Sequence, residues 1–438
     1  MKSLVILILL TMISLSWAQN EMAGKCMTCH KLKSPGLYKQ WYESQHGMHE
    51  VTCLDCHGAS KSEADAFLHE GAYIATLVTP EDCGNCHEKE AREVQNSYHA
   101  TAGEILDSQD AYLAHVTGGE PAAILGCESC HGAKVIIDDN SPNKLSKKSW
   151  PNSGIGRINP DGSKGSCNTC HTRHNFDKTQ ARQPEACGKC HLGPDHPQME
   201  IYEESKHGNT YYTNIDKMNL HSDKWVVGED YFVAPTCATC HMSATPSKKL
   251  SHDVGERLSW TLRPAISVHK DNWQQKRKNM LTVCQSCHGS AFAEGHYYQY
   301  DALVHLYNEK FAKPATDIMN LVIQEKLLEN PASFGNKIEW TYWELWHHEG
   351  RRARHGASMM GPDYTWWHGI YEVVQHFYFK FIPEAQSFKN KKVDDYIKNL
   401  FEKDATHQWL STNTEELKKG IRSGKLQQKY QELFIQDK

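Results

Sequence analysis

The sequence predicts a mainly α-helical protein with a loop-rich N-terminal region and a helical C-terminal region. Residues 301–438 contain long segments with apolar residues at helical spacing, and they contain no cysteine. Residues 19–300 hold all 16 cysteines and are divided by Gly-, Pro- and Asn-rich stretches such as Ser141–Gly165, which indicate loops. No segment of any length alternates apolar and polar residues as a strand does. We therefore expect two regions, 19–300 and 301–438, after a leader at 1–18.

The C-terminal region is expected to form a set of helices that packs over the N-terminal region. Asn330-Pro331 and Gly361-Pro362 punctuate this region and separate its periodic segments. The predicted helices are Asp301–Leu328, Ile338–His355, Trp366–Lys380, Val393–Phe401 and Thr414–Leu433.

The first residues resemble a secretory signal. Lys2 supplies a positive charge, Leu4–Leu10 begins an apolar run, and Ser16-Trp17-Ala18 has the small-x-small pattern of a cleavage site. The run is short for a membrane span, although an uncleaved N-terminal anchor is the alternative. We expect an exported, periplasmic protein that is soluble once residues 1–18 are removed.

The cysteines follow one pattern, Cys-x-x-Cys-His, which occurs eight times and uses all 16 of them. This is the attachment sequence of haem c: two thiols form thioethers with the porphyrin edge, and the histidine binds the iron from one face. Zinc ribbons and disulfides, the alternatives, do not require a histidine after the second cysteine. The cofactor-binding cysteines are Cys26, Cys29, Cys53, Cys56, Cys83, Cys86, Cys127, Cys130, Cys167, Cys170, Cys187, Cys190, Cys237, Cys240, Cys284 and Cys287. The proximal iron ligands are His30, His57, His87, His131, His171, His191, His241 and His288.

With eight covalent haems, the predicted fold class is a mainly α multihaem cytochrome c with haem-wrapping loops and a helical C-terminal region. The motifs are irregularly spaced, so the chain is not a tandem repeat. The formal net charge is −5 without any block of like charge, which argues against nucleic acid as a partner. A mildly acidic surface suits docking of a small basic redox partner.

The sixth ligand decides what each iron does. A second histidine closes the iron for electron transfer, whereas an open position lets a small molecule bind. The chain has 27 histidines, so 19 remain after the eight proximal ligands, and counting alone does not establish an open site. The alternative for each remaining histidine is a solvated or hydrogen-bonded side chain. The candidate distal ligands are His46, His99, His174, His207, His252, His355 and His368.

At this point the chain resembles the octahaem hydroxylamine oxidoreductase (HAO) family over nearly its whole mature length. The resemblance rests on eight haem motifs in one chain, on Gly126–Gly132 as the fourth, and on Cys-Asn-Thr-Cys-His-Thr-Arg-His-Asn-Phe at 167–176. It rests also on Gly-Pro-Asp-His-Pro-Gln at 193–198 and on the long run His347–Gly369.

The resemblance implies seven bis-histidine haems and one open, catalytic haem on Cys127, Cys130 and His131. It implies a pocket Asp-His pair, which matches Asp195 and His196; a capped turn is the alternative reading of these two residues. Histidine titrates near neutral pH, so His196 is the expected proton donor and acceptor, with Asp195 orienting it.

Oxidising members of the family carry a tyrosine that is cross-linked to the catalytic haem, and reducing members lack the cross-link. Tyr364 is the candidate for that tyrosine, and an ordinary tyrosine that packs on a haem is the alternative. Related pentahaem nitrite reductases place a tyrosine three residues after a proximal histidine, where this chain has His174. His174 is therefore expected to be an iron ligand instead.

Three functions follow from this reading. The first is oxidation of hydroxylamine to nitric oxide or nitrite, the second is reduction of nitrite or hydroxylamine to ammonia, and the third is an electron conduit with every iron closed. The expected partners are the small nitrogen substrate and a cytochrome or quinol-linked redox partner, in a homotrimer as the family forms. Arg351, Arg352 and Arg354 are expected to bind haem propionates. Attraction of anionic nitrite is a second role for them, and a solvated helix face is the alternative.

Overall fold

The computed structural model describes residues 22–107 and 109–435, and it shows a mainly helical protein, as the sequence predicts. The chain divides into two compact units. Unit 1 comprises the residues up to Ala186 together with Ser251–Gly255, and unit 2 comprises Cys187–Leu250 and the residues from Glu256 on. The composition boundary near residue 300 therefore lies within unit 2, and the two regions predicted from composition stay a prediction. The expected signal at residues 1–18 lies outside the described residues.

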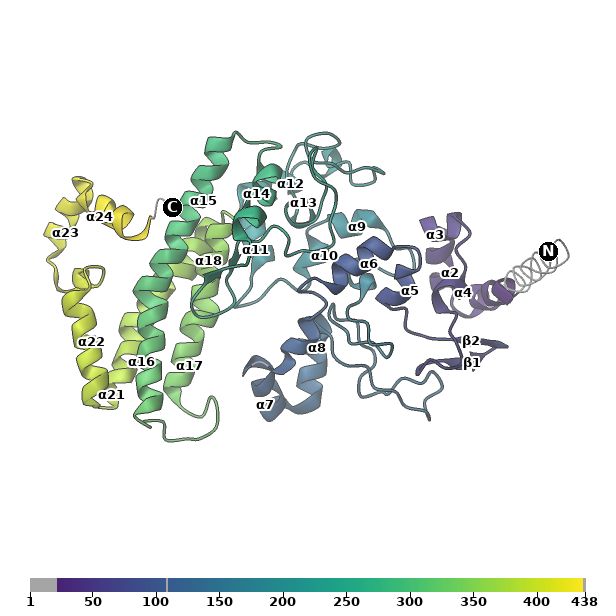
Figure 1. Ribbon diagram of the computed structural model, residues 1–438, viewed down its shortest axis with the longest axis horizontal. Coiled ribbons are helices and arrows are strands. Elements are labelled where there is room, and N and C mark those ends of the chain that lie inside the picture. The colour runs from purple at the N-terminus through teal and green to yellow at the C-terminus, as the bar shows by residue number, and fades with distance from the viewer. Residues whose placement is uncertain (1–21, 108, 436–438) are drawn as a thin grey trace, which may run out of the picture. The chain divides into compact units, whose positions relative to one another are not determined.

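Unit 1 is built from short helices joined by long loops (Figure 1). Residues 22–33 are helical, and the later elements of unit 1 are α2 (Pro35–Tyr42), α3 (Gln45–Met48), α4 (Cys53–His57), β1 (Phe67–His69), β2 (Ala72–Ile74), α5 (Pro80–Gly84), α6 (Glu88–Gln95), η1 (Ala102–Asp107), α7 (Gln109–Leu125), α8 (Cys127–His131), η2 (Cys167–Thr169) and α9 (Lys178–Arg182). Helix α10 (Glu185–Gly188) spans the boundary with unit 2.

The loop between α8 and η2 confirms the expected irregular stretch at Ser141–Gly165, since residues 132–166 contain no helix. The apolar cluster beside this loop is small, with Leu77, Val135 and Leu145 as its buried residues. A small apolar core is what we expect where porphyrin rings supply much of the buried apolar surface.

Unit 2 contains longer helices. Its first elements are α11 (Gln198–Glu204), α12 (Lys206–Tyr212), η3 (Ile215–Lys217), α13 (Cys237–His241), β3 (Trp260–Thr261), β4 (Val268–His269) and α14 (Trp273–Cys284). The C-terminal elements are α15 (Ser290–Tyr307), η4 (Asn308–Ala312), α16 (Lys313–Gln324), α17 (Lys337–Trp343), η5 (Glu344–Glu349), α18 (Gly350–Ser358), α19 (Pro362–Thr365), η6 (Trp366–Tyr371), α20 (Glu372–His376), η7 (Phe377–Phe381), α21 (Ile382–Ser387), α22 (Lys391–Lys403), η8 (Gln408–Ser411), α23 (Thr414–Arg422) and α24 (Lys425–Phe434).

Wider π-helical turns interrupt the C-terminal helices, which the periodicity did not predict. Turn η4 precedes Pro314 and turn η7 precedes Pro383. Proline has no N–H for the carbonyl four residues earlier, and its ring clashes with that carbonyl, so a widened turn lets the helix continue. Figure 1 shows α15 and α16 as one rod through η4.

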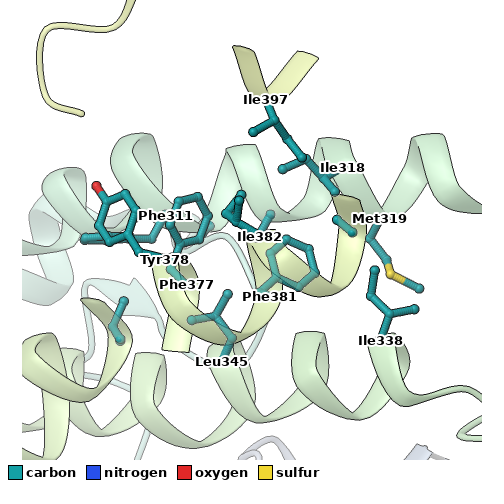
Figure 2. Close-up of a cluster of buried hydrophobic side chains, with 14 of the residues drawn as sticks. Phe311, Ile318, Met319, Ile338, Leu345, Phe377, Tyr378, Phe381, Ile382 and Ile397 are labelled. Carbon is teal, nitrogen blue, oxygen red and sulfur yellow. The ribbon is translucent and has the colours of Figure 1, made fainter. Parts of the chain in front are cut away.

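The main hydrophobic core lies among these C-terminal helices. Figure 2 shows Phe311 and Ile318 of the α15–α16 rod facing Phe377 and Phe381, and all four side chains are fully buried. Ile397 of α22 packs on the same cluster. The helical character predicted for this region is thus confirmed, and its apolar residues form this core.

Three expectations need correction. The structure contains two short antiparallel pairs, β1–β2 and β3–β4, although the sequence showed no strand pattern, because two or three residues are too few to show an alternation. The predicted helix Thr414–Leu433 breaks into α23 and α24 at Gly424, whose φ of 74° is a left-handed conformation that ends a helix. The first predicted C-terminal helix starts at Ser290, 11 residues before Asp301.

Among the described residues, no helix has the length and apolar character needed to cross a bilayer.

Candidate functional site

Three of the haem motifs form a single helical turn that begins at the first cysteine: α4, α8 and α13. Residues three apart lie on the same side of a helix, so one turn presents both thiols together, with the histidine directly after them. Caps hold these turns: Thr52 and Asp55 form a capping box on α4, and Thr236 and Thr239 form one on α13. All 16 cysteines are free of disulfides.

Four histidine pairs in unit 1 have a spacing that suits a haem iron. Each pair joins a motif histidine to a histidine at least 39 residues away in the sequence. Two imidazoles bound to opposite faces of one iron have ring centroids about 6 Å apart. The centroid distances are 6.4 Å for His30–His69, 6.1 Å for His87–His46, 6.2 Å for His57–His174 and 6.5 Å for His171–His252.

Unit 2 contains a fifth such pair, His288–His207, with ring centroids 6.1 Å apart. Burial lowers the pKa of His207, His252 and His174, to about 4 for His174, which favours the neutral imidazole that iron requires. The residues present therefore fit haem: thiols at the attachment spacing and neutral histidines on facing sides. Four predicted ligands, His46, His174, His207 and His252, lie at this distance from a motif histidine.

His99 and His368 are two further distal candidates. His99 is half-buried just before η1. His368 is half-exposed between two carboxylates, 3.1 Å from Glu372 and 3.5 Å from Asp363. Sequence reasoning missed His69, which lies in the β1–β2 hairpin, because no aromatic helix or following glycine marks it.

Asp195 is the centre of a charged network in unit 2. The ring Nδ1 of His196 donates to one carboxylate oxygen at 2.6 Å, and Nη1 of Arg351 donates to the other at 2.9 Å. Nη1 of Arg351 also lies 2.9 Å from Nε2 of His347, whose buried ring stacks on Trp343. Burial acts to raise the pKa of the Asp195 carboxyl, but the hydrogen bond from His196 and the charge of Arg351 hold that pKa well below its usual range. The carboxylate is therefore ionised and fixes the orientation of the His196 ring.

The histidine of the sixth motif, His191, lies next to this network. Its ring centroid is 6.2 Å from that of His196, and its Nδ1 donates to the Gln198 side chain at 3.3 Å. The Gln198 amide also lies 3.5 Å from Nε2 of His355. Burial and the charge of Arg354 lower the pKa of His355 to about 3, so its ring is neutral. His196 and His355 are thus both near the sixth motif.

The arginine cluster does not form a solvated face, and its partners are protein groups. Arg351 binds Asp195 and the Arg263 carbonyl, and Arg352 binds Glu372 at 2.5 Å. Arg354 is fully buried against carbonyl oxygens and the hydroxyl of Ser267. The propionate role predicted for these arginines stays a prediction.

Tyr364 lies at the start of α19, where Gly356 of α18 approaches the chain closely. A Cβ on Gly356 would lie 2.6 Å from the Tyr364 carbonyl carbon, so only glycine permits this crossing. The Tyr364 amide donates to Glu204 at 3.2 Å, and its ring packs 5.4 Å from that of His368.

The third and fifth motifs lie close together in unit 1, because the Cys83 and Cys167 thiols are near enough to shift each other's pKa. Since these thiols carry the porphyrin edges, two haems attached there would be neighbours.

Comparison with known proteins agrees with this picture. Residues 159–333, which include the last four motifs, match the multi-haem cytochrome family described as "seven times multi-haem cytochrome CxxCH". A curated relative, the probable nitrite reductase-hydroxylamine oxidoreductase fusion protein of Kuenenia stuttgartiensis, is 23% identical over 466 residues, covering 80% of this chain. The chain spans about half the length of that relative.

Two solved structures share the fold. A hypothetical multiheme protein superposes with a TM-score of 0.72 at 24% identity, covering 84% of this chain and 94% of its own. A reducing HAO-like protein complex of Kuenenia stuttgartiensis superposes with a TM-score of 0.63 at 21% identity, covering 87% and 88% of the two chains.

The fold and the motifs thus define a multihaem c-type cytochrome. Its sequence is similar to that of the nitrite reductase-hydroxylamine oxidoreductase fusion protein, and its fold is shared by the reducing HAO-like complex.

Proposed function

We propose that this protein is an exported octahaem oxidoreductase that converts hydroxylamine to nitric oxide or nitrite at one open haem, with seven haems as electron carriers. The observation that supports the proposal is the Asp195 network, in which an ionised carboxylate orients the His196 ring. Asp195 and His196 are the two residues that the family resemblance implies for the pocket. The haems would supply the iron that binds the nitrogen lone pair and the sites that accept its electrons.

The residues that hold the haems follow from the motifs and the histidine pairs. The thiols of each motif would form the thioethers, and the five long-range histidine pairs would hold the irons of the first, second, third, fifth and eighth haems. The open iron is assigned to the fourth motif, on Cys127, Cys130 and His131. Proximity of Cys83 and Cys167 would let electrons pass between the third and fifth haems.

The chain's own part in the chemistry is proton handling. His196 donates its Nδ1 proton to Asp195, which leaves Nε2 to take a proton from a substrate N–H or O–H group. When Nε2 gains that proton, the ionised Asp195 stabilises the positive ring. Arg351 keeps Asp195 ionised and fixed in place.

Reduction of nitrite or hydroxylamine to ammonia is the second candidate, and the fold shared with a reducing HAO-like complex favours it. A cross-link between haem and the Tyr364 ring, which packs 5.4 Å from that of His368, would mark an oxidising member instead. The expected assembly is a homotrimer that exchanges electrons with a cytochrome or quinol-linked partner.

Asp195→Asn and His196→Gln in the full haem-loaded protein test the proposal, with His368→Gln as the control for a histidine outside the network. Loss of a general acid–base group costs about 10²- to 10⁴-fold in turnover, so both network variants should lose this much and the control should not. Hydroxylamine oxidation with an artificial acceptor and nitrite reduction with a reduced dye measure the two directions. Full activity in both network variants would refute the assigned proton path. Wild-type protein with eight haems and no turnover in either direction would indicate an electron conduit.

A further inference from the structure

Arg257 is a fully buried arginine in unit 2 that donates hydrogen bonds to the backbone of the seventh haem motif. Its Nη1 donates to the carbonyl oxygens of Thr239 and Cys240, both at 3.1 Å. Its Nη2 donates to the carbonyl oxygens of Met242 and Ser243, at 3.4 and 2.6 Å. These four carbonyls lie on both sides of the proximal histidine, His241, so one guanidinium fixes the backbone that carries the iron ligand.

The charge of Arg257 has no carboxylate partner within ion-pair distance in the described part of the chain; its hydrogen-bond partners are neutral carbonyls. The neighbouring carboxylate, Glu256, binds Lys248 at 3.1 Å instead. Burial lowers the pKa of Arg257, but an arginine keeps its proton in proteins. The carbonyl dipoles at the end of α13 and the charge of the neighbouring Glu256 offset this buried positive charge in part.

We propose that Arg257 is a positioning residue that holds His241 and raises the reduction potential of the haem attached at Cys237–His241. Reduction adds one electron, so the ferrous haem carries one positive charge less than the ferric haem. A buried cation beside it therefore disfavours the ferric form. The inference depends on haem attachment at this motif and is independent of the reaction catalysed elsewhere.

Charge and geometry are separated by three variants of the full haem-loaded protein. Arg257→Gln removes the charge, and Arg257→Lys keeps the charge while losing most of the carbonyl contacts. Thr236→Ala loosens the same turn from its other end without any change of charge, because the Thr236 hydroxyl accepts from the Thr239 amide. A potentiometric titration followed by visible and EPR spectra measures the midpoint potential of each haem.

In Arg257→Gln, one haem of the eight should become about tenfold harder to reduce, a shift of about 59 mV for one electron. Arg257→Lys and Thr236→Ala should leave that haem within about twofold of the wild type. An unchanged potential in Arg257→Gln would overturn the proposal. So would equal shifts in all three variants, since the effect would then come from the shape of the turn.

If Arg257→Gln does not load its haems, Glu256→Gln replaces it. Removing this neighbouring negative charge leaves Arg257 less compensated, so the same haem should become easier to reduce, by about twofold for a partly solvated carboxylate. A shift in the opposite direction, or none, would contradict the electrostatic role.

Discussion

Lys310 is a buried cation among the C-terminal helices. Replacing it with methionine should stabilise the protein. The side chain comes from η4 and is 7% exposed. Its ammonium group donates to the Tyr430 hydroxyl of α24 at 3.0 Å and lies 5.3 Å from the centre of the same ring. Burial lowers the pKa of Lys310 from 10.5 to about 8.

The size and sign of the effect follow from that pKa. A fall from 10.5 to about 8 corresponds to about 3 kcal/mol against the charged form in the folded state. Between pH 8 and pH 10.5 the folded chain binds fewer protons than the unfolded chain, so the free energy of unfolding rises with pH in this range. The whole destabilising effect of Lys310 is therefore present below about pH 8. The penalty disappears as the pH rises toward 10.5. Methionine avoids it but loses the hydrogen bond to Tyr430, worth about 1 kcal/mol, so the net gain near pH 7 is about 2 kcal/mol.

Guanidinium unfolding of the haem-loaded protein, followed by circular dichroism at several pH values from 7 to 9.5, measures this difference. The advantage of Lys310→Met over the wild type should shrink steadily above pH 8. Lys398→Met, at a side chain that is 69% exposed, should differ little from the wild type at any pH. A Lys310→Met variant that is less stable at pH 7, or an advantage that is the same at pH 7 and 9.5, would refute the reasoning.

Three further outcomes are expected. His69→Ala should open one additional iron, seen as one more carbon monoxide bound per chain after reduction, whereas His368→Ala should not; equal binding in both would remove His69 as a ligand. Phe377→Ala should lower the free energy of unfolding by about 3–5 kcal/mol, because the ring is fully buried in the helical core, and a loss under 1 kcal/mol in denaturant titration would contradict this. Gly356→Ala should displace Tyr364, since the added Cβ meets the backbone, and a crystal structure with α19 unmoved would disprove it.

The haem motifs and the helical character of the C-terminal region could be predicted from the sequence because both are local patterns. The apolar spacing in Asp301–Leu328 correctly placed a helix, since one stripe of that helix packs into the core. The same pattern could not show the π-helical turns at η4 and η7, because a turn widened by one residue changes the spacing too little to be noticed.

The histidine pairs could not be read from the sequence for a different reason. His57 and His174 are 117 residues apart, and only the folded loops bring them to 6.2 Å. His69 had no local signal because its ring is presented by a hairpin of two three-residue strands. Ligands of this kind depend on chain path, which periodicity does not describe.

The sequence separation of two histidines decides how strongly their proximity supports binding to one iron. His191 and His196 are five residues apart in one loop, so their separation of 6.2 Å follows from connectivity and is weak evidence that both bind one iron. His355 comes from a distant helix, is neutral, and reaches the same place through Gln198. If His355 is the sixth ligand at this motif, His196 keeps a free nitrogen for protons while Asp195 holds the other. The axial role and the proton role then fall to different residues, as the proposed function requires. Loss of one low-spin haem signal in His355→Ala, with that signal retained in His196→Gln, would establish this division, and the reverse result would make His196 an iron ligand.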